Sequence, residues 1–374
     1  MAIDKVTSAS ITDSAVTDAK LSFNANQFRN IVINGDMSIA QRATSTASIT
    51  SAGYHTVDRF QTSITNMGTW TQSQSTTVPS GQGFATSLKM DCTTADASPA
   101  AGDDLKIRTK FEGQNLQYLK KGTSSAESLT ASFWVRSNKT GTYIVELMDN
   151  DNSYRHINKS YTISSADTWE KKTITFAGDT TGAFGNDNGA SLEMSFYLGA
   201  GSNQTSGTLQ TSWGTSTSAN RQVGQVNLAD STSNEWYITG VQLEAGTTAS
   251  DFEFLPHDVN LQRCQRYFNR PINGSGQGIC TAGAYNSSDA FGIYIFPVKM
   301  RTTPSLETTS GSSYYNFIGN NTGTSFNGPL VLSTGTESSA QIAFSAFGGA
   351  LTQGVAGAFR SANASSSVAF SAEL

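Results

Sequence analysis

The sequence predicts an all-β protein, with two β-sandwich domains joined by a short helix and preceded by an extended N-terminal segment. Runs such as SFWVRS (132–137) and TITF (173–176) alternate apolar and polar residues, as strands with one buried face do. No long segment repeats apolar residues about every 3.6 positions, so we expect little helix. One interruption of the strand pattern sets the expected boundaries: 1–29 extended segment, 30–252 first sandwich, 253–269 helical linker and 270–374 second sandwich.

The first sandwich is expected to begin at NIVINGDMSIAQR, residues 30–42. The apolar run Ile31–Ile33 predicts a strand, and Asn34-Gly35 is a dipeptide that two-residue hairpin turns favour. Later strands supply core residues at alternate positions, because successive side chains of a strand point to opposite faces. The expected core residues are Phe133, Val135, Ile174, Phe176, Met194 and Phe196.

The linker 253–269 is predicted to hold a short amphipathic helix. Pro256 stops the preceding strand, and Asp258 can cap the start of the helix. Two roles for its apolar face stay open: packing onto its own domain, or meeting copies of itself on a symmetry axis. The residues of that face, at i, i+3 and i+7, are Leu261, Cys264 and Phe268.

The second sandwich is expected to hold two recognisable strands. FGIYIFPV (291–298) is dense enough in apolar residues to predict a buried strand, in which Pro297 marks a bulge or an edge. VAFSAEL (368–374) alternates weakly and predicts a terminal strand.

Composition argues against several classes of function. Charged residues are only 14% of the chain and the net charge is −5, which gives no electrostatic footprint for nucleic acid or membrane lipid. No run approaches the roughly 20 apolar residues of a membrane-spanning helix. The N-terminus has no apolar signal core, so we expect release by cell lysis rather than Sec-type export. Cys92, Cys264 and Cys280 match neither a disulfide framework nor a metal site, and we expect them to be reduced and mostly buried.

The N-terminal segment contains KVTSASITDSAVTDAKL, whose apolar residues recur every five positions. Neither a helix nor a strand has that period. Two interpretations stay open: a disordered tail, or a segment that becomes ordered on a partner or wound with copies of itself. The regular spacing favours the second interpretation, and its residues are Val6, Ile11, Val16 and Leu21.

The sequence lacks the common motifs of catalysis. The sequence has no HExxH, GxSxG or GxxxxGK[ST] pattern, and its three histidines are widely separated. We therefore expect no enzymatic activity and no cofactor. MDNDNS (148–153) and GNDNG (185–189) offer oxygen ligands that suit calcium without matching an EF-hand, so they are weak metal candidates. The acidic residues concerned are Asp149, Asp151 and Asp187.

Aromatic residues in polar loops indicate a binding site for a sugar. Aromatic faces stack on the apolar faces of sugar rings, while neighbouring amides, carboxylates and guanidinium groups hydrogen-bond the hydroxyls. The alternative is that these residues cap the sandwich core or lie at subunit interfaces. The candidates are Tyr285, Tyr314 and Tyr315 first, then Trp213 and Tyr154, with His156 and Trp70 beside them.

NIVINGDMSIAQR, YHTVDRF (54–60), EWYITGVQLEAG (235–246) and IFPVKMRTTPSL (295–306) together resemble bacteriophage tail-fibre proteins of marine and cyanobacterial phages. The resemblance implies that residues from Asn34 to about Glu244 form a jelly roll like that of carbohydrate-binding modules. It also implies that the leader ITDSAVTDAKL joins the virion. That family often binds calcium near its first turn, where Asp36 is the one obvious matching acid.

These observations predict a virion tail fibre that binds a host-surface glycan without catalysis. It would be assembled in the host cytoplasm, would form a homotrimer, and would contact other tail or capsid proteins through its N-terminus. Two alternatives stay open: a capsid decoration or tail-connecting protein without receptor binding, and a polysaccharide-degrading tailspike. Long β-helix repeats would favour the tailspike, and the sequence has none.

Overall fold

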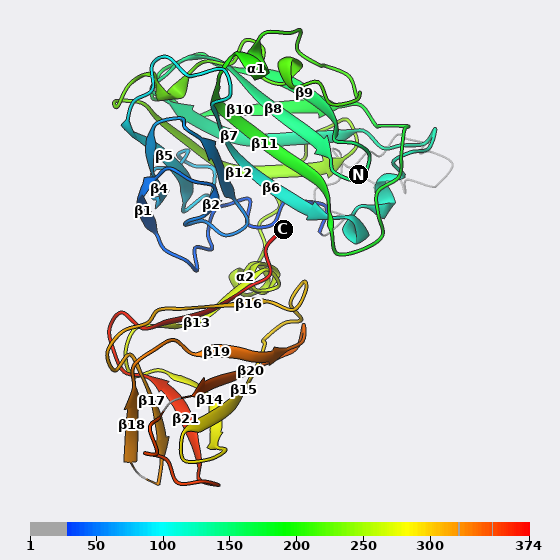
Figure 1. Cartoon of the computed structure of the whole chain (residues 1–374). Helices are drawn as coiled ribbons and strands as arrows, with labels where there is room; N and C mark the ends of the chain where they lie inside the picture. Colours follow the sequence, from blue (N-terminus) through cyan, green and yellow to red (C-terminus); the bar gives the residue numbers. More distant parts are fainter. Residues whose placement is uncertain (1–27, 321, 346) are drawn as a thin grey trace, which may run out of the picture.

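The computed structural model describes residues 28–320, 322–345 and 347–374. It is nearly all β, with 43% strand and 7% helix, so the predicted fold class is confirmed. Two β units lie one above the other, with the helix α2 (His257–Gln265) between them (Figure 1). The attachment residues predicted in the leader, Val6, Ile11, Val16 and Leu21, lie outside the described residues.

The first unit consists of two six-stranded antiparallel sheets that enclose one core. In spatial order, one sheet contains β1 (Ser45–Ile49), β4 (Thr69–Ser75), β5 (Ser87–Thr94), β12 (Glu235–Ala245), β7 (Leu129–Ser137) and β10 (Glu170–Phe176). The other sheet contains β2 (Gly53–Tyr54), β3 (Gln61–Thr65), β6 (Asp104–Glu112), β11 (Ala190–Ala200), β8 (Gly141–Asp149) and β9 (Arg155–Ile163).

Strand alternation builds this core as predicted. Phe133 of β7 is fully buried and makes an edge-to-face contact with Phe196 of β11, at 5.0 Å between ring centroids. Such contacts between the two sheets hold a sandwich together. Of the six expected core residues, Ile174 is partly buried, and the remaining five are buried: Phe133, Val135, Phe176, Met194 and Phe196.

The opening stretch differs from its prediction. Residues 30–42 form no strand; a turn covers 33–36. The segment instead lies against β12, because the Ile31 N–H donates to the Leu243 carbonyl at 2.9 Å and the Val241 N–H donates to the Gly35 carbonyl at 2.9 Å. The buried Asn34 side chain donates to the carbonyls of Ile39 and Asp58 at 2.9 and 3.0 Å. The expected strand was wrong because two separate hydrogen bonds to β12 and the Asn34 side chain, rather than a continuous ladder, satisfy this backbone. The turn expected at Asn34-Gly35 is present.

Asp58 beneath this turn gives stability a specific pH dependence. Burial raises its pKa to about 7, although two hydrogen bonds from Gln41 oppose the rise. The folded chain therefore keeps a proton that the unfolded chain loses near pH 4, so this contribution to stability is lost as the pH rises through 7. We expect wild type to lose this stability as the pH rises, whereas Asp58→Asn cannot. The free energy of unfolding of Asp58→Asn minus that of wild type, both measured in urea, should therefore increase by up to ~1.4 kcal/mol per pH unit between pH 5 and 7.

His55 titrates in both proteins, so the difference between the two curves isolates Asp58. The exposed Asp258→Asn serves as the control and should run parallel to wild type. Parallel curves for Asp58→Asn and wild type would contradict the assignment.

The second unit combines a three-stranded and a seven-stranded antiparallel sheet. The smaller sheet contains β13 (Phe268–Asn273), β22 (Ser367–Ser371) and β16 (Ser305–Thr308). The larger contains β18 (Thr322–Phe326), β17 (Tyr315–Gly319), β21 (Ala356–Ser361), β14 (Gly278–Ala284), β15 (Asp289–Ile295), β20 (Ser339–Ser345) and β19 (Val331–Gly335). The predicted terminal strand is present as β22.

The strand predicted from FGIYIFPV is present as β15, but it is not buried on both faces. Ala290 is buried, whereas Ile293 is 49% exposed and Ile295 is 75% exposed. These two residues alternate along the outer face of the larger sheet, and no described element covers them. The apolar run predicts a strand buried on both faces, and this is wrong because the sequence shows composition and not what lies above the sheet.

The helix α2 packs inside its own chain. The predicted cap by Asp258 was wrong, because Pro256 occupies the N-cap position and no side chain caps the helix. Asp258 lies in the first turn, where a negative charge is favourable. Cys264 is fully buried, and Phe268 is the buried first residue of β13 rather than part of the helix. Of the three predicted interface residues, only Leu261 is partly accessible. The prediction that Cys264 and Phe268 contact another copy of the chain was therefore wrong. The cysteines are free, as expected.

A buried charged network ties the two units together. The guanidinium of Arg59, from the first unit, pairs with Glu373 of the second and lies over the Tyr267 ring, 3.5 Å from its centroid. Arg42 pairs with the same carboxylate at 3.1 Å. The C-terminal end of the chain therefore returns to the junction beside α2 (Figure 1). In the described part of the chain, no helix has the length and apolarity needed to cross a bilayer.

Candidate functional site

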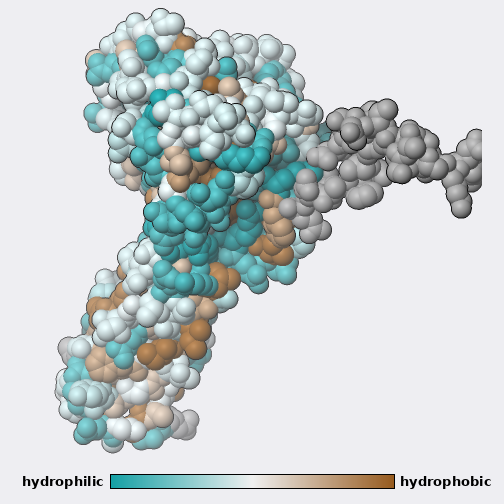
Figure 2. Space-filling model, turned by 90° about the vertical axis from the view of Figure 1, so that its right-hand side faces the viewer, coloured by the Kyte–Doolittle hydropathy of each residue, from teal (hydrophilic) through white to brown (hydrophobic). Residues whose placement is uncertain are grey.

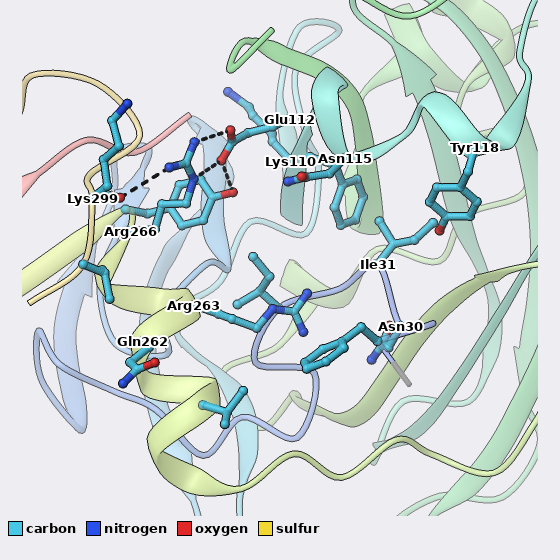
Figure 3. A pocket seen from close by; sticks show the side chains of 16 residues that line it. Asn30, Ile31, Lys110, Glu112, Asn115, Tyr118, Gln262, Arg263, Arg266 and Lys299 are labelled. Carbon is cyan, nitrogen blue, oxygen red and sulfur yellow. Dashed lines mark hydrogen bonds and ion pairs between the residues drawn. The ribbon is translucent and has the colours of Figure 1, made fainter. Parts of the chain in front are cut away.

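A groove of about 540 Å³ lies where α2 and the second unit meet the first unit (Figure 3). In the surface view, hydrophilic residues (teal) and hydrophobic ones (brown) adjoin at the level where the two units join (Figure 2). Apolar residues of the groove are Phe28, Ile31, Ile33, Phe111, Val259 and Val298. Its polar and aromatic residues are Asn30, Lys110, Glu112, Asn115, Tyr118, Gln262, Arg263, Arg266, Tyr267 and Lys299.

One wall of the groove is a face of α2. Val259, Gln262, Arg263 and Arg266 stand at i, i+3, i+4 and i+7, so they share that face. It is a different face from the one that buries Cys264. The same helix therefore packs one side into the chain and presents guanidinium and amide groups on another.

The opposite wall comes from two short 3-10 turns after β6, Gly113–Asn115 and Gln117–Leu119. Asn115 and the half-exposed Tyr118 lie on these turns (Figure 3). The first turn needs glycine at position 113, because a Cβ there would lie 2.0 Å from the Gly185 carbonyl oxygen. Because the backbone at Gly113 packs directly against the backbone at Gly185, the turns that follow place Tyr118 at the groove.

Glu112 is a carboxylate of the groove whose charge is already neutralised. It accepts two hydrogen bonds from the Arg266 guanidinium, both of 2.7 Å, and others from Tyr267 and Gln114. Burial by itself would raise the pKa of Glu112, but the bonds from Arg266 and Tyr267 outweigh it and lower that pKa. Glu112 thus acts as a fixed acceptor that holds Arg266 in place.

Arg263 differs from Arg266 in having no such partner. Its side chain extends from α2 into the groove, and no hydrogen bond or ion pair joins it to another described residue (Figure 3). Burial lowers the pKa of Arg263, and the charges of Cys264, Tyr267 and Glu253 oppose that shift. On the far side Lys110 donates to the Leu374 backbone oxygen at 3.1 Å, and Lys299 pairs with Glu337 at 2.6 Å.

Three of the seven predicted sugar-binding residues are buried and were wrongly predicted to be exposed. Trp70 is a core residue whose indole N–H donates to the Met67 carbonyl at 2.7 Å. Tyr315 is buried in the second core, where its hydroxyl lies 2.9 and 2.8 Å from the carbonyl oxygens of Thr309 and Ser367 and donates to one of them. His156 is enclosed beside Glu146, with 3.2 Å between Nδ1 and the carboxylate. Each polar tip is satisfied inside the protein, so a polar sequence context did not mean exposure.

The other four candidates are dispersed. Trp213 packs partly against the first core and donates to the Ala177 carbonyl at 2.7 Å. Tyr154 and Tyr285 are exposed, on different units, and Tyr314 is partly buried. None of the seven lines the groove.

The weak calcium candidates are held by hydrogen bonds. Asp36 accepts from the Asn260 side chain at 3.1 Å, and the buried Asp149 pairs with Lys121 at 2.5 Å. Asp151 accepts from the Gly185 N–H and Asp187 from the Gly189 N–H, both at 2.8 Å. Among the described residues, no three His, Cys, Asp or Glu side chains gather as a metal site would require.

Sequence reasoning missed the groove residues, although one signal was available. The spacing of Val259, Gln262, Arg263 and Arg266 marks a second helix face as clearly as the apolar spacing marks the first. Tyr118, by contrast, has no local signal, because its partners across the groove are distant in sequence.

No protein-family model matches the sequence, and no curated protein matches it. Solved structures similar to the chain include the enzymatically active domain of bacteriophage CBA120 tailspike protein 4, at 14% identity and TM-score 0.31, covering 58% of this chain and 21% of that one. TmCBM61 in complex with β-1,4-galactotriose is similar at 9% identity and TM-score 0.27, covering 58% of this chain and 99% of that one. The family 11 carbohydrate-binding module of a Clostridium thermocellum cellulase follows at 11% identity and TM-score 0.26, covering 58% and 96%. At these identities and TM-scores, no ligand or activity transfers from those proteins to this chain.

Proposed function

We propose that this chain is a glycan-binding protein without catalytic activity and that the groove beside α2 holds the sugar. The observation that carries the proposal is the chemistry of the groove: one half-exposed aromatic ring, side-chain amides and a guanidinium converge on about 540 Å³. That volume falls within the range of roughly 300 to 1,000 Å³ for small-ligand sites, which favour junctions between domains.

The individual groups match what a sugar ring offers. The Tyr118 ring, 49% exposed as a residue, gives an apolar face for stacking. Asn115 and Gln262, on opposite walls, can each donate to and accept from hydroxyl groups. Glu112 is the one carboxylate among the described residues that line the groove, whereas glycoside hydrolysis ordinarily uses two. This supports binding rather than cleavage.

We further propose that the protein is a tail fibre of a phage particle and that the sugar belongs to the host surface. Support comes from the sequence resemblance, the low share of charged residues and the groove chemistry. Adsorption blocking by the purified chain tests receptor binding against a purely structural role in the capsid or tail. Release of reducing ends from host polysaccharide would instead favour a tailspike enzyme. An image of the labelled protein on the particle tests its position.

Tyr118→Ala should weaken glycan binding. Losing one stacked ring should cost about 1 kcal/mol, which is roughly a fivefold rise in Kd. Titration of the full chain with an oligosaccharide selected from a glycan panel measures the effect. Tyr154→Ala and Tyr285→Ala, which remove exposed rings outside the groove, provide the comparison. Weaker binding in either of these variants, with Tyr118→Ala unchanged, would place the sugar on the loops.

We also propose a homotrimer, assembled through the outer face of the larger sheet of the second unit. Ile293, Ile295 and Val331 are exposed there, and brown surface is visible on this unit (Figure 2). Across the strands Ile295 faces Ser339, and Ile293 faces Gln341. The pairs carry no charge, so a second copy can cover them without burying an unpaired ion.

Ile295→Asp should dissociate that trimer. Light scattering is expected to give about three times 39.7 kDa for wild type and a single chain for the variant, because each interface would bury a new unpaired carboxylate. Tyr154→Asp places the same charge on an exposed site of the first unit and should leave the mass unchanged. A monomeric wild type at micromolar concentration would rule the trimer out.

A further inference from the structure

Among the described residues that line the groove, one cation has neither a hydrogen bond nor an ion pair. Among its lining residues are the cations Lys110, Arg263, Arg266 and Lys299, and the carboxylate Glu112. Arg266 is paired with Glu112, and Lys299 is paired at the rim with Glu337. Arg263 is the cation that points into the groove with no hydrogen bond or ion pair to another described residue.

The carboxylate that acts on Arg263 electrostatically, Glu253, is used elsewhere. Its two oxygens accept from the backbone N–H groups of Phe28 and Asn30. Glu253 therefore secures the chain at the groove edge, and it makes no hydrogen bond or ion pair with the Arg263 guanidinium. Each of these backbone donors thus has an acceptor, whereas no described residue accepts a hydrogen bond from Arg263.

Leaving this guanidinium unpaired is costly. Arg263 lies among the apolar side chains of Phe28, Ile31 and Val259, where a charge loses part of its hydration without gaining a partner. Its planar group offers parallel N–H donors that match a carboxylate at two points, which is the strongest pairing open to it. The groove is thus preorganised for an anion that enters from solution.

We infer that the groove takes an acidic sugar, of the uronic-acid class, with its ring carboxylate on Arg263 and its apolar face on Tyr118. The inference rests on the proposed glycan function and adds the charge of the ligand. The groove favours a sugar over an acidic peptide. Its aromatic ring can stack on the face of a sugar ring, and the amides of Asn115 and Gln262 can hydrogen-bond several hydroxyls within one small site.

The test compares an oligogalacturonate with the neutral galactose oligomer of equal length, titrated calorimetrically into the full chain. Wild type should bind the acidic oligomer roughly tenfold or more tightly, the usual worth of a hydrogen bond to a charged group. Arg263→Gln should remove that preference, and Arg263→Lys should keep only part of it, because an ammonium lacks the two-point geometry. Lys171→Gln, on the exposed edge strand β10, removes an equal charge elsewhere and should retain the preference.

The melting temperature of Arg263→Gln should equal or exceed that of wild type, since an unpaired cation is removed; a lower value would point to a structural role. Equal binding of both oligomers, unaffected by Arg263→Gln, would overturn the acidic-sugar inference and leave the glycan function intact. If the chain binds neither oligomer and no other glycan of a panel, both the acidic-sugar inference and the proposed glycan function are overturned. Tighter binding of an acidic peptide than of the uronate, lost in Arg263→Gln, would assign the groove to a protein partner.

Discussion

Glu373→Gln is expected to lower the free energy of unfolding by about 3 to 5 kcal/mol, the cost of breaking a buried ion pair from one side. Its partner Arg59 is 1% exposed, so water cannot replace the lost carboxylate. Burial by itself would lower the pKa of Arg59, and Glu373 reverses that shift. After the substitution, a neutral amide would face a guanidinium that stays charged between Tyr267 and the Lys110 carbonyl.

Urea unfolding of the full chain measures this loss. Glu337→Gln is the matched control, because it removes the carboxylate from the exposed pair with Lys299, where the expected loss is within about 1 kcal/mol. Equal stabilities for the two variants would show that the Arg59 pair is solvated in solution. A selective loss in Glu373→Gln would show that the two units are joined by a buried charge as well as by the chain at α2.

Gly35→Ala is expected to destabilise the first unit by about 3 kcal/mol, as overpacking against rigid backbone does. A Cβ at position 35 would lie 2.0 Å from the carbonyl oxygen of Val241 in β12. That backbone is held in the centre of its sheet between β5 and β7, so the turn must move instead. Moving it stretches the hydrogen bond from Val241 N–H to Gly35 and disturbs the wall that carries Ile31.

Gly278→Ala in β14 is the control, because a Cβ there meets nothing within 4 Å. Thermal unfolding should separate the two variants clearly, with Gly278→Ala within about 0.5 kcal/mol of wild type. A Gly35→Ala protein as stable as wild type would mean that the opening turn does not rest on β12.

Several properties were accessible from sequence because they depend on neighbours along the chain. Alternation at Phe133 and Val135 predicted strands with one buried face, and Pro256 followed by an acidic residue predicted the helix that the structure has at His257–Gln265. The all-β class follows from such local patterns, since side-chain direction repeats every second residue of a strand. The same alternation did not show that Ile295 lies exposed on the outer face of its sheet, because exposure depends on whether another sheet or helix packs on that face.

The site depended on tertiary structure. Trp70 and Tyr154 both stand among polar residues, yet one is enclosed between two sheets and the other is exposed. Tyr118 and Arg263 belong to segments that are distant in the sequence. They reach one groove because β12 pairs with β5 and β7 and because the buried Arg59–Glu373 pair joins the two units. Local sequence determines which side of a strand or helix is apolar. Many long-range contacts together decide which of these sides face each other. Such contacts place Tyr118 and Arg263 at one groove, and they bury His156 and Tyr315.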